Sequence, residues 1–141
     1  MKKIICTVCF SLAVLFNGNA NAAYSILIDN SDQDNVFSLY FVTDEYAVVA
    51  GYQLDFAYDD TEMSYVGYTN DVPSVGIIPD MFGAPNGTTP GIINNFNAFT
   101  FFGSPYYAEA GSTTLIGTLT FSINDGAIAD GERDLWMNLN P

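Results

Sequence analysis

The sequence predicts an all-β protein, an antiparallel β-sandwich with jelly-roll topology and roughly seven to nine strands. Three observations favour this class. Apolar and polar residues alternate with period two along most of the chain. No segment of useful length after residue 22 has the period of an amphipathic helix. Clusters of Gly, Pro, Asn and Asp separate the alternating runs at short intervals, as turns do.

In the first half of the chain, alternation predicts the strands Tyr24–Asp29, Val36–Val42, Val48–Tyr58 and Met63–Thr69. The polar segments Asp29–Asn35 and Asp59–Glu62 supply turns, because Asp and Asn side chains bond to the backbone of the residues that follow. The third strand has the clearest pattern, since Gln53 and Asp55 lie opposite a continuous apolar face. That face consists of Val48, Ala50, Tyr52, Leu54, Phe56 and Tyr58.

The second half begins with a long loop, Asp71–Pro90, which contains four of the six prolines. Val75–Ile78 could add a short strand within it. The strands expected after the loop are Ile92–Phe102, Thr114–Ile123 and Asp134–Asn140. In the second of these, one face consists of Leu115, Leu119, Phe121 and Ile123, and the other of Ile116, Thr118, Thr120 and Ser122. In the last, Leu135, Met137 and Leu139 alternate with Trp136, Asn138 and Asn140.

Residues 1–22 have the features of a secretory signal peptide. Lys2 and Lys3 precede an apolar run, Ile4–Phe16, that is too short to cross a bilayer as a helix. Ala20-Asn21-Ala22 has the small residues of a cleavage site. We therefore expect cleavage before Ala23, one mature domain at residues 23–141, and a secreted protein that is extracellular or periplasmic. An N-terminal membrane anchor is the alternative.

Removal of this leader changes the charge and the chemistry of the chain. Both cysteines and two of the three basic residues leave with it, and the chain has no histidine. The mature domain then has one basic residue, Arg133, and 16 acidic residues, so its net charge is −15. Nucleic acid and anionic membranes need Lys and Arg to neutralise phosphates, so neither is an expected partner. This charge is compatible with calcium, with basic partners, or simply with solubility outside the cell.

The same composition argues against an enzyme. Without His and Cys, the mature domain lacks the commonest general base, the thiolate nucleophile and the usual zinc and copper ligands. A carboxylate pair, as in glycosidases, is the class that stays open. The nearest acids, Asp55, Asp59, Asp60 and Glu62, lie at a tight turn, where aspartate is favoured for structural reasons. We expect no catalytic residue.

Two long stretches together resemble the cohesin domain. Val49-Ala50-Gly51-Tyr52-Gln53-Leu54-Asp55-Phe56-Ala57-Tyr58-Asp59, followed by Met63, is similar to the family's strand with a Tyr-Asp turn. The segment Gly111–Ile123 (GSTTLIGTLTFSI) is similar to its Gly…Leu-x-x-(Ile/Leu)-x-Phe strand, and a loop and a closing strand follow within Asp125–Asn140. The resemblance covers most of the mature chain in the family's order.

This resemblance implies a jelly-roll sandwich and, as partner, a calcium-loaded dockerin or a dockerin-like extracellular protein. Cohesin-like domains also occur singly in secreted bacterial proteins. The chain departs from the family's pattern in three places. Asp60 stands where Pro often follows the Tyr-Asp pair, Met63 stands in place of Leu, and Pro141 comes directly after the last strand. None of the motifs identifies a dockerin-contacting face.

Two acidic clusters could bind calcium, which prefers oxygen ligands on loops. The first consists of Asp29, Asp32 and Asp34, and the second of Asp59, Asp60 and Glu62. Neither has the spacing of an EF-hand loop. A solvated turn is the simpler interpretation of both clusters, because Asp is a common turn residue. Apart from this possible calcium, no cofactor is expected.

Sugar binding is the other role that exposed aromatic side chains suggest. Trp136 alternates away from the apolar residues of the last strand and shares its side with Asn138, while Tyr106 and Tyr107 follow Pro105. Aromatic rings stack on pyranose rings and amides bond to hydroxyls, so these four residues form a candidate carbohydrate or partner face. The run Asn94–Phe99 has a similar mixture. The alternative is that Trp136 packs under a loop.

The sequence therefore predicts a secreted, non-catalytic binding module of cohesin-like type that docks an extracellular protein or associates with polysaccharide. One alternative is a carbohydrate-binding module that uses an exposed Trp and Tyr face. A third is a structural cell-surface or matrix protein that self-associates and has no soluble ligand.

Overall fold

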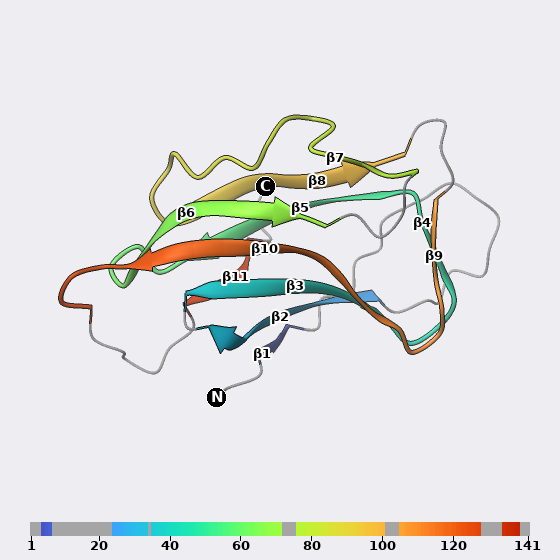
Figure 1. The fold of residues 1–141 in the computed structure, drawn as a ribbon, viewed down its shortest axis with the longest axis horizontal. Helices are drawn as coiled ribbons and strands as arrows, with labels where there is room; N and C mark the ends of the chain where they lie inside the picture. The colour runs from blue at the N-terminus through green and yellow to red at the C-terminus, as the bar shows by residue number, and fades with distance from the viewer. Residues whose placement is uncertain are drawn as a thin grey trace.

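A computed structural model describes residues 4–6, 24–33, 35–71, 76–100, 105–127 and 134–138. These residues form eleven strands and no helix, which confirms the all-β class (Figure 1). None of them forms an apolar helix that could span a membrane. The long strands are β2 (Tyr24–Gln33), β3 (Val36–Thr43), β5 (Gly51–Tyr58), β6 (Met63–Asn70), β8 (Ile92–Phe99) and β10 (Thr113–Ile123). The short strands are β1 (Ile4–Cys6), β4 (Ala47–Val49), β7 (Ile78–Pro79), β9 (Tyr106–Ala108) and β11 (Leu135–Met137).

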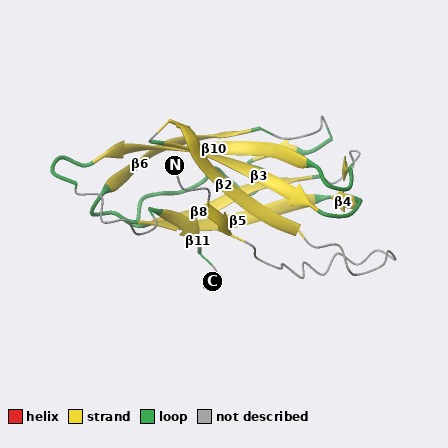
Figure 2. Ribbon diagram, turned by 90° about the horizontal axis from the view of Figure 1, so that it is seen from below, coloured by secondary structure: helices red, strands yellow, loops and turns green. Residues whose placement is uncertain are grey.

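The strands form two main sheets that face each other, as in a β-sandwich. One has the order β1-β2-β3-β10-β6 and the other the order β11-β5-β8-β7, and β4 and β9 form a separate pair. Every strand pairing is antiparallel. Figure 2 shows the two layers edge-on, with β10, β3 and β6 in one layer and β5, β8 and β11 in the other. The jelly-roll connectivity and the number of seven to nine strands stay predictions.

Alternating side chains of both sheets build one core. On β5, the predicted face of Tyr52, Leu54, Phe56 and Tyr58 is buried, and Gln53 is exposed. Aromatic rings connect the sheets across the core: the Tyr58 and Phe121 ring centroids are 5.2 Å apart, and those of Tyr68 and Phe96 are 6.4 Å apart. Such edge-to-face contacts add to the apolar burial that stabilises the sandwich.

The strand predicted as Val48–Tyr58 is two strands, which corrects the prediction for Val48. The pairing changes at Ala50: β5 pairs with β8 and β11, whereas β4 pairs with β9. Val48 is therefore 46% exposed instead of contributing to the core. The partner strand β9 lies where the sequence predicted only a loop around Tyr106 and Tyr107.

The predicted faces of β10 are wrong at its start, because a β-bulge lies between Leu115 and Gly117. A bulge adds one residue and so reverses the faces on one side of it. Ile116 is buried and Leu115 is 38% exposed, the reverse of the prediction, while Leu119 and Phe121 are buried as expected. Gly117 permits this geometry: its φ is +153°, and a Cβ there would lie 2.3 Å from the Thr69 carbonyl oxygen. Ile123, at the end of β10, is exposed instead of buried.

Three boundaries also differ from the sequence prediction. β2 continues beyond the predicted end at Asp29 to Gln33, with a register shift after Asp29, so Asp32 lies in a strand instead of a turn. β8 ends at Phe99. Residues Ile4–Cys6, inside the predicted leader, form β1. Asp34, Val75, Leu139 and Asn140 lie outside the described residues.

Candidate binding surfaces

A network of polar side chains joins β6 to β8 through the segment that follows β7. The Tyr68 hydroxyl donates to Asp80 Oδ2 (2.8 Å), and Asn70 Nδ2 donates to Asp80 Oδ1 (2.9 Å). Asn70 Nδ2 also donates to the Asn97 carbonyl oxygen (2.7 Å), and Asn70 Oδ1 accepts a bond from the Tyr52 hydroxyl (3.0 Å). We call Tyr52, Tyr68, Asn70, Asp80 and Asn97 the closing network, because its bonds link the two sheets along one side.

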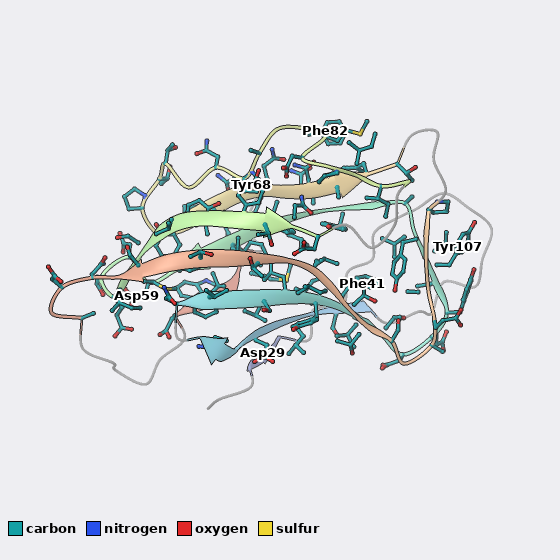
Figure 3. All side chains as sticks on the ribbon, viewed as in Figure 1. Asp29, Phe41, Asp59, Tyr68, Phe82 and Tyr107 are labelled. Carbon is teal, nitrogen blue, oxygen red and sulfur yellow. The ribbon has the colours of Figure 1, made fainter. Side chains whose placement is uncertain are left out.

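Asn97 is the buried centre of this network. Its side chain is fully buried and accepts a bond from the Phe82 amide at 3.1 Å. It donates to the carbonyl oxygens of Gly83 and Asn95, both at 2.8 Å. These bonds hold residues 82–83 over the outer face of β8. Figure 3 shows Phe82 on this segment, along the β8 edge of the molecule. Asn95 and Asn97, in the amide-rich run Asn94–Phe99, therefore have a structural role, and sugar binding by this run stays a prediction.

The network shifts the pKa of its tyrosines upward. Burial, followed by the hydrogen bond to Asp80 and the charge of that carboxylate, raises the pKa of Tyr68 to about 12. Burial and the charges of Asp80 and Asp71 raise the pKa of Tyr52 well above its ordinary value. Both hydroxyls stay protonated at neutral pH and serve as donors. The closing network is therefore a structural clamp in which these two hydroxyls act as hydrogen-bond donors.

The outer face of the five-stranded sheet carries a row of small polar side chains. Strand register places Asp29 beside Ser38, Ser38 beside Thr118, and Thr118 beside Thr69. The Thr118 and Thr69 hydroxyl oxygens are 3.0 Å apart, and the Thr69 hydroxyl donates to Asp71 Oδ2 at 2.8 Å. This hydroxyl row (Asp29, Ser38, Thr118, Thr69) thus crosses β2, β3, β10 and β6 and has a carboxylate at each end.

Apolar side chains lie on both sides of the hydroxyl row. Leu27, Tyr40 and Leu115 form the neighbouring cross-strand row on the same face. Val66 is 63% exposed, because it is the extra residue of a bulge in β6 between Tyr65 and Gly67. No lysine or arginine belongs to any described strand of this sheet. We call this surface, which has hydroxyls between apolar side chains and acids at the margin, the candidate docking face, or docking face for short.

A pair of tyrosines marks the end of the molecule formed by β4 and β9. The rings of Tyr46 and Tyr107 are stacked with centroids 6.3 Å apart and an interplanar angle of 19°. Tyr107 is 52% exposed. Tyr106 points the other way: it packs on the core, and its hydroxyl lies 2.6 Å from Thr114 Oγ1. Tyr106 and Tyr107 therefore have different roles: Tyr106 packs against the core, and Tyr107 has a solvent-exposed ring.

Trp136 lies on a different sheet from the tyrosine pair. It is 37% exposed on β11, between the buried Leu135 and Met137, and it pairs with Ala57 of β5. Asn138, which follows, donates its backbone amide to the Asp55 carbonyl oxygen at 2.8 Å. In Figure 1, β9 is at the right end and β11 is toward the opposite half of the molecule. The four residues predicted as one carbohydrate face are thus not brought together.

The second acidic cluster forms a tight turn between β5 and β6. Asp59 Oδ1 accepts bonds from the Thr61 amide (2.8 Å) and the Thr61 hydroxyl (2.6 Å), and these bonds lower its pKa. The carbonyl oxygens of Asp60 and Glu62 accept bonds from Asn124. Within the described residues, no three His, Cys, Asp or Glu side chains are grouped so as to hold a metal ion.

The first acidic cluster is only partly described. Asp29 is half-buried on β2, at one end of the hydroxyl row. Asp32 belongs to the same strand, and Asp34 lies outside the described residues. Figure 3 places Asp29 and Asp59 at separate positions, so the two clusters do not combine. Calcium binding stays a prediction.

Comparison with known proteins adds no relative: no family model, no curated protein and no solved structure matches the chain.

Sequence reasoning missed the closing network and the hydroxyl row. Alternation along the sequence indicates that Thr118 lies on the polar face of its strand. Its alignment with Ser38 and Thr69 depends on strand order and register, which alternation does not predict. The one available signal was the concentration of Asn and Asp around a proline-rich loop, at Asn70, Asp80 and Asn97.

Proposed function

We propose that the mature domain is a secreted, non-catalytic binding module of cohesin-like type that docks an extracellular protein with a basic surface. The observation that carries the proposal is the docking face on the five-stranded sheet. It combines exposed Val66 and Leu115 with the hydroxyl row. Exposed apolar groups beside polar ones are the composition of protein interfaces, whose apolar centre is surrounded by hydrogen-bonding groups.

The charge of the domain supports a basic partner. The mature domain has 16 acidic residues and one basic residue, and carboxylates end the hydroxyl row at Asp29 and next to Thr69 at Asp71. A positively charged surface would be steered toward this face, and association would slow as salt screens the attraction. The resemblance to cohesins implies a dockerin-type partner, which would in addition require calcium.

A rigid scaffold supports docking with little change of shape. Rings pack across the core, and the closing network links β6 to β8 by bonds of 2.7–3.0 Å. A preformed sheet face presents its side chains in fixed positions, so binding costs little ordering of the chain. Of the groups with resolved pKa shifts, Tyr52 and Tyr68 belong to the closing network and Asp59 to a turn, and these structural roles support a non-catalytic role for the domain.

The test is a pull-down with the immobilised mature domain from the secreted and cell-surface fraction of the source organism, in calcium buffer. We expect a discrete protein band that Val66→Glu abolishes. Ile78→Glu is the matched control, because Ile78 is an exposed aliphatic residue on β7 of the other sheet. Loss of the band on chelation would identify a dockerin-type partner. A band that survives Val66→Glu would contradict docking on this face.

The tyrosine pair favours polysaccharide binding as a second candidate function. Tyr46 and Tyr107 are exposed and stacked at the end of the molecule, where an open ring face can pack on a pyranose ring. If the pull-down retains polysaccharide instead of protein, Tyr107→Ala should abolish retention. Trp136→Ala tests the other exposed aromatic residue, and retention by both variants would exclude an aromatic sugar site at either place.

A further inference from the structure

The edge of the five-stranded sheet is occupied by a segment of the predicted leader. β1 pairs antiparallel with β2 in the register Ile4 to Ile28, Ile5 to Leu27 and Cys6 to Ile26. Figure 1 shows β1 beside β2 at the outer edge of this sheet, on the side away from β3. The pairing demonstrates that the outer edge of β2 accepts a short extended strand made of apolar residues.

Cleavage before Ala23 would remove β1 and leave the core intact. All described members of the core come from Ile26 onward. The backbone of residues 26–28 would then lose its outer ladder partner, and β2 would become the edge of the sheet. Unpaired strand edges are templates for pairing with another chain.

This edge lacks the features that usually block such pairing. Ser25–Ile28 reads SILI, with no proline, lysine or acidic residue. Other edges of the sandwich are less suited to pairing: β7 and β11 have only two and three residues, β7 includes Pro79, and β6 has a bulge at Val66. The outer edge of β2 is therefore the strand edge best suited to accept a further strand.

We propose that the mature domain forms a dimer in which the β2 strands of two copies pair antiparallel, in place of β1. The occupant is a second copy because Ile26-Leu27-Ile28 has the same character as Ile4-Ile5-Cys6: three apolar residues, rich in isoleucine. In an antiparallel pairing centred on Leu27, a twofold rotation axis passes between the two Leu27 residues and exchanges the two copies. Isologous dimers require such an axis. The pairing joins the two four-stranded sheets that are left after the loss of β1 into one continuous sheet, a β-augmentation.

The acidic half of β2 fixes this register. Centred on Leu27, the pairing puts Ile26 opposite Ile28 and Ser25 opposite Asp29. The two Asp29 residues are then four positions apart, about 13 Å along the strands, beyond the screening length of about 8 Å at physiological salt. Registers shifted toward Asp32 would bring the acidic segments of both copies together. The net charge of each copy also predicts a dimer that strengthens as salt increases.

The experiment is sedimentation of the exported protein, with its N-terminus confirmed by mass spectrometry, over a range of concentrations and at low and high salt. We expect a monomer–dimer equilibrium that shifts toward dimer with salt. Leu27→Glu should abolish the dimer, because two carboxylates would then face each other at its centre. Leu27 points away from the core, between the buried Ile26 and Ile28, so this variant keeps the fold.

Val66→Glu is the matched control, since it places the same charge on the same sheet at the opposite edge. It should dimerise like the unchanged protein while losing the proposed docking partner, so the two proposals can fail separately. A synthetic peptide of residues 2–8, which contains β1, should dissociate the dimer. Backbone amides of residues 26–28 should exchange more slowly with deuterium as concentration rises.

Three results would overturn the proposal. The first is a protein that stays monomeric at every concentration and salt level. The second is a dimer that survives both Leu27→Glu and the peptide, which would locate the interface elsewhere. The third is an exported protein that retains its leader, because β1 would then keep the edge occupied.

Discussion

The two long sides of the sandwich differ in how the edges of the two sheets are connected. On one side, the closing network carries the chain from β6 to β8, and polar side chains bind backbone groups of residues 82–83. On the other side, the two sheets end at β1 and β11, and cleavage of the predicted leader would leave β2 as the outermost strand of its sheet. We call these the closed side and the open side.

This difference shows that polar residues serve two purposes in one small domain. On the closed side, Asn97 and Asp80 have their bonding capacity used by the protein itself. Such residues stabilise the fold and are poor candidates for binding a ligand. On the open side, Trp136 is partly exposed, and the outer edge of β2 would become available to a partner once β1 is removed. The predictions that follow disturb the closed side in steps of decreasing effect.

The largest effect is expected for Asn97→Leu, because leucine has the same branching and number of side-chain heavy atoms but no hydrogen-bonding group. The Phe82 amide and the Gly83 and Asn95 carbonyl oxygens would lose their bonds to this fully buried side chain. Unsatisfied buried groups cost about 1–3 kcal/mol each, and partial access to water reduces the sum, so we expect a loss of about 2–4 kcal/mol in the free energy of unfolding. Urea denaturation measures it.

Asn94→Leu is the control for this change, because Asn94 is exposed on the same strand. We expect its free energy of unfolding to stay within about 0.5 kcal/mol of the unchanged protein. Equal losses for the two variants would show that the amide of Asn97 has no special role and that the closed side is held by packing alone.

The next effect is steric and concerns Gly87. A Cβ at this position would lie 2.2 Å from Cδ1 of the Tyr65 ring. Gly87→Ala must therefore displace either the loop or the ring, and overpacking of this kind costs about 1–3 kcal/mol. Gly67→Ala is the matched control, since nothing lies within 4 Å of its Cβ position. If both variants unfold at the same urea concentration, the loop does not depend on this close approach.

These positions also show what a single sequence can and cannot predict. The buried faces of β5 and β11 follow strict period two, so Tyr52, Leu54, Leu135 and Met137 were identified correctly. Alternation is a local property, and it survives wherever a strand is regular. The exposed position of Trp136 followed from the same rule.

The features that failed depend on contacts between segments far apart in the sequence. The bulge at Gly117 depends on the Thr69 carbonyl and on the Phe96 ring, which lie within 3 Å of its Cβ position. The exchange of partner at Ala50 depends on β9, more than 50 residues later. Asn97 has an amide side chain of the kind that often binds ligands. Its structural role becomes visible only from its hydrogen bonds to the loop that covers it. Tyr106 and Trp136 were grouped because both are aromatic, and sheet membership separates them.

A smaller effect is expected from alkaline pH, through the tyrosines of the closed side. The pKa of Tyr68 rises from 10.0 to about 12 in the folded protein, so the unfolded chain releases this proton first. The stabilisation is fully present below pH 10 and is lost as pH rises toward 12. Stability measured against pH should therefore fall in this interval.

Tyr68→Phe tests the assignment. This variant loses the bond to Asp80 and should be less stable at neutral pH, but its stability should fall less steeply between pH 10 and 12. A remaining slope is expected from Tyr52, whose pKa is also raised. Parallel curves for the variant and the unchanged protein would assign the alkaline loss to other groups.

The smallest effect is expected for Asp59, and it sharpens the contrast between two aspartates. The carboxylate bonds of Asp80 to Tyr68 and Asn70 are partly buried, whereas those of Asp59 to Thr61, within its own turn, are exposed to solvent. Water can replace the bonds of an exposed carboxylate but not those of a buried one. Asp80→Ala should therefore lower the midpoint of thermal unfolding clearly more than Asp59→Ala does.

Acid titration separates the two aspartates further. The bonds from Thr61 lower the pKa of Asp59 below its ordinary value, so its contribution is present at neutral pH and is lost as pH falls below 3.8 toward the folded value. Asp59→Asn keeps an oxygen acceptor but does not titrate, and its stability should vary less with pH in this acidic range. If Asp59→Ala were instead as damaging as Asp80→Ala, the turn between β5 and β6 would be as important to the fold as the closing network.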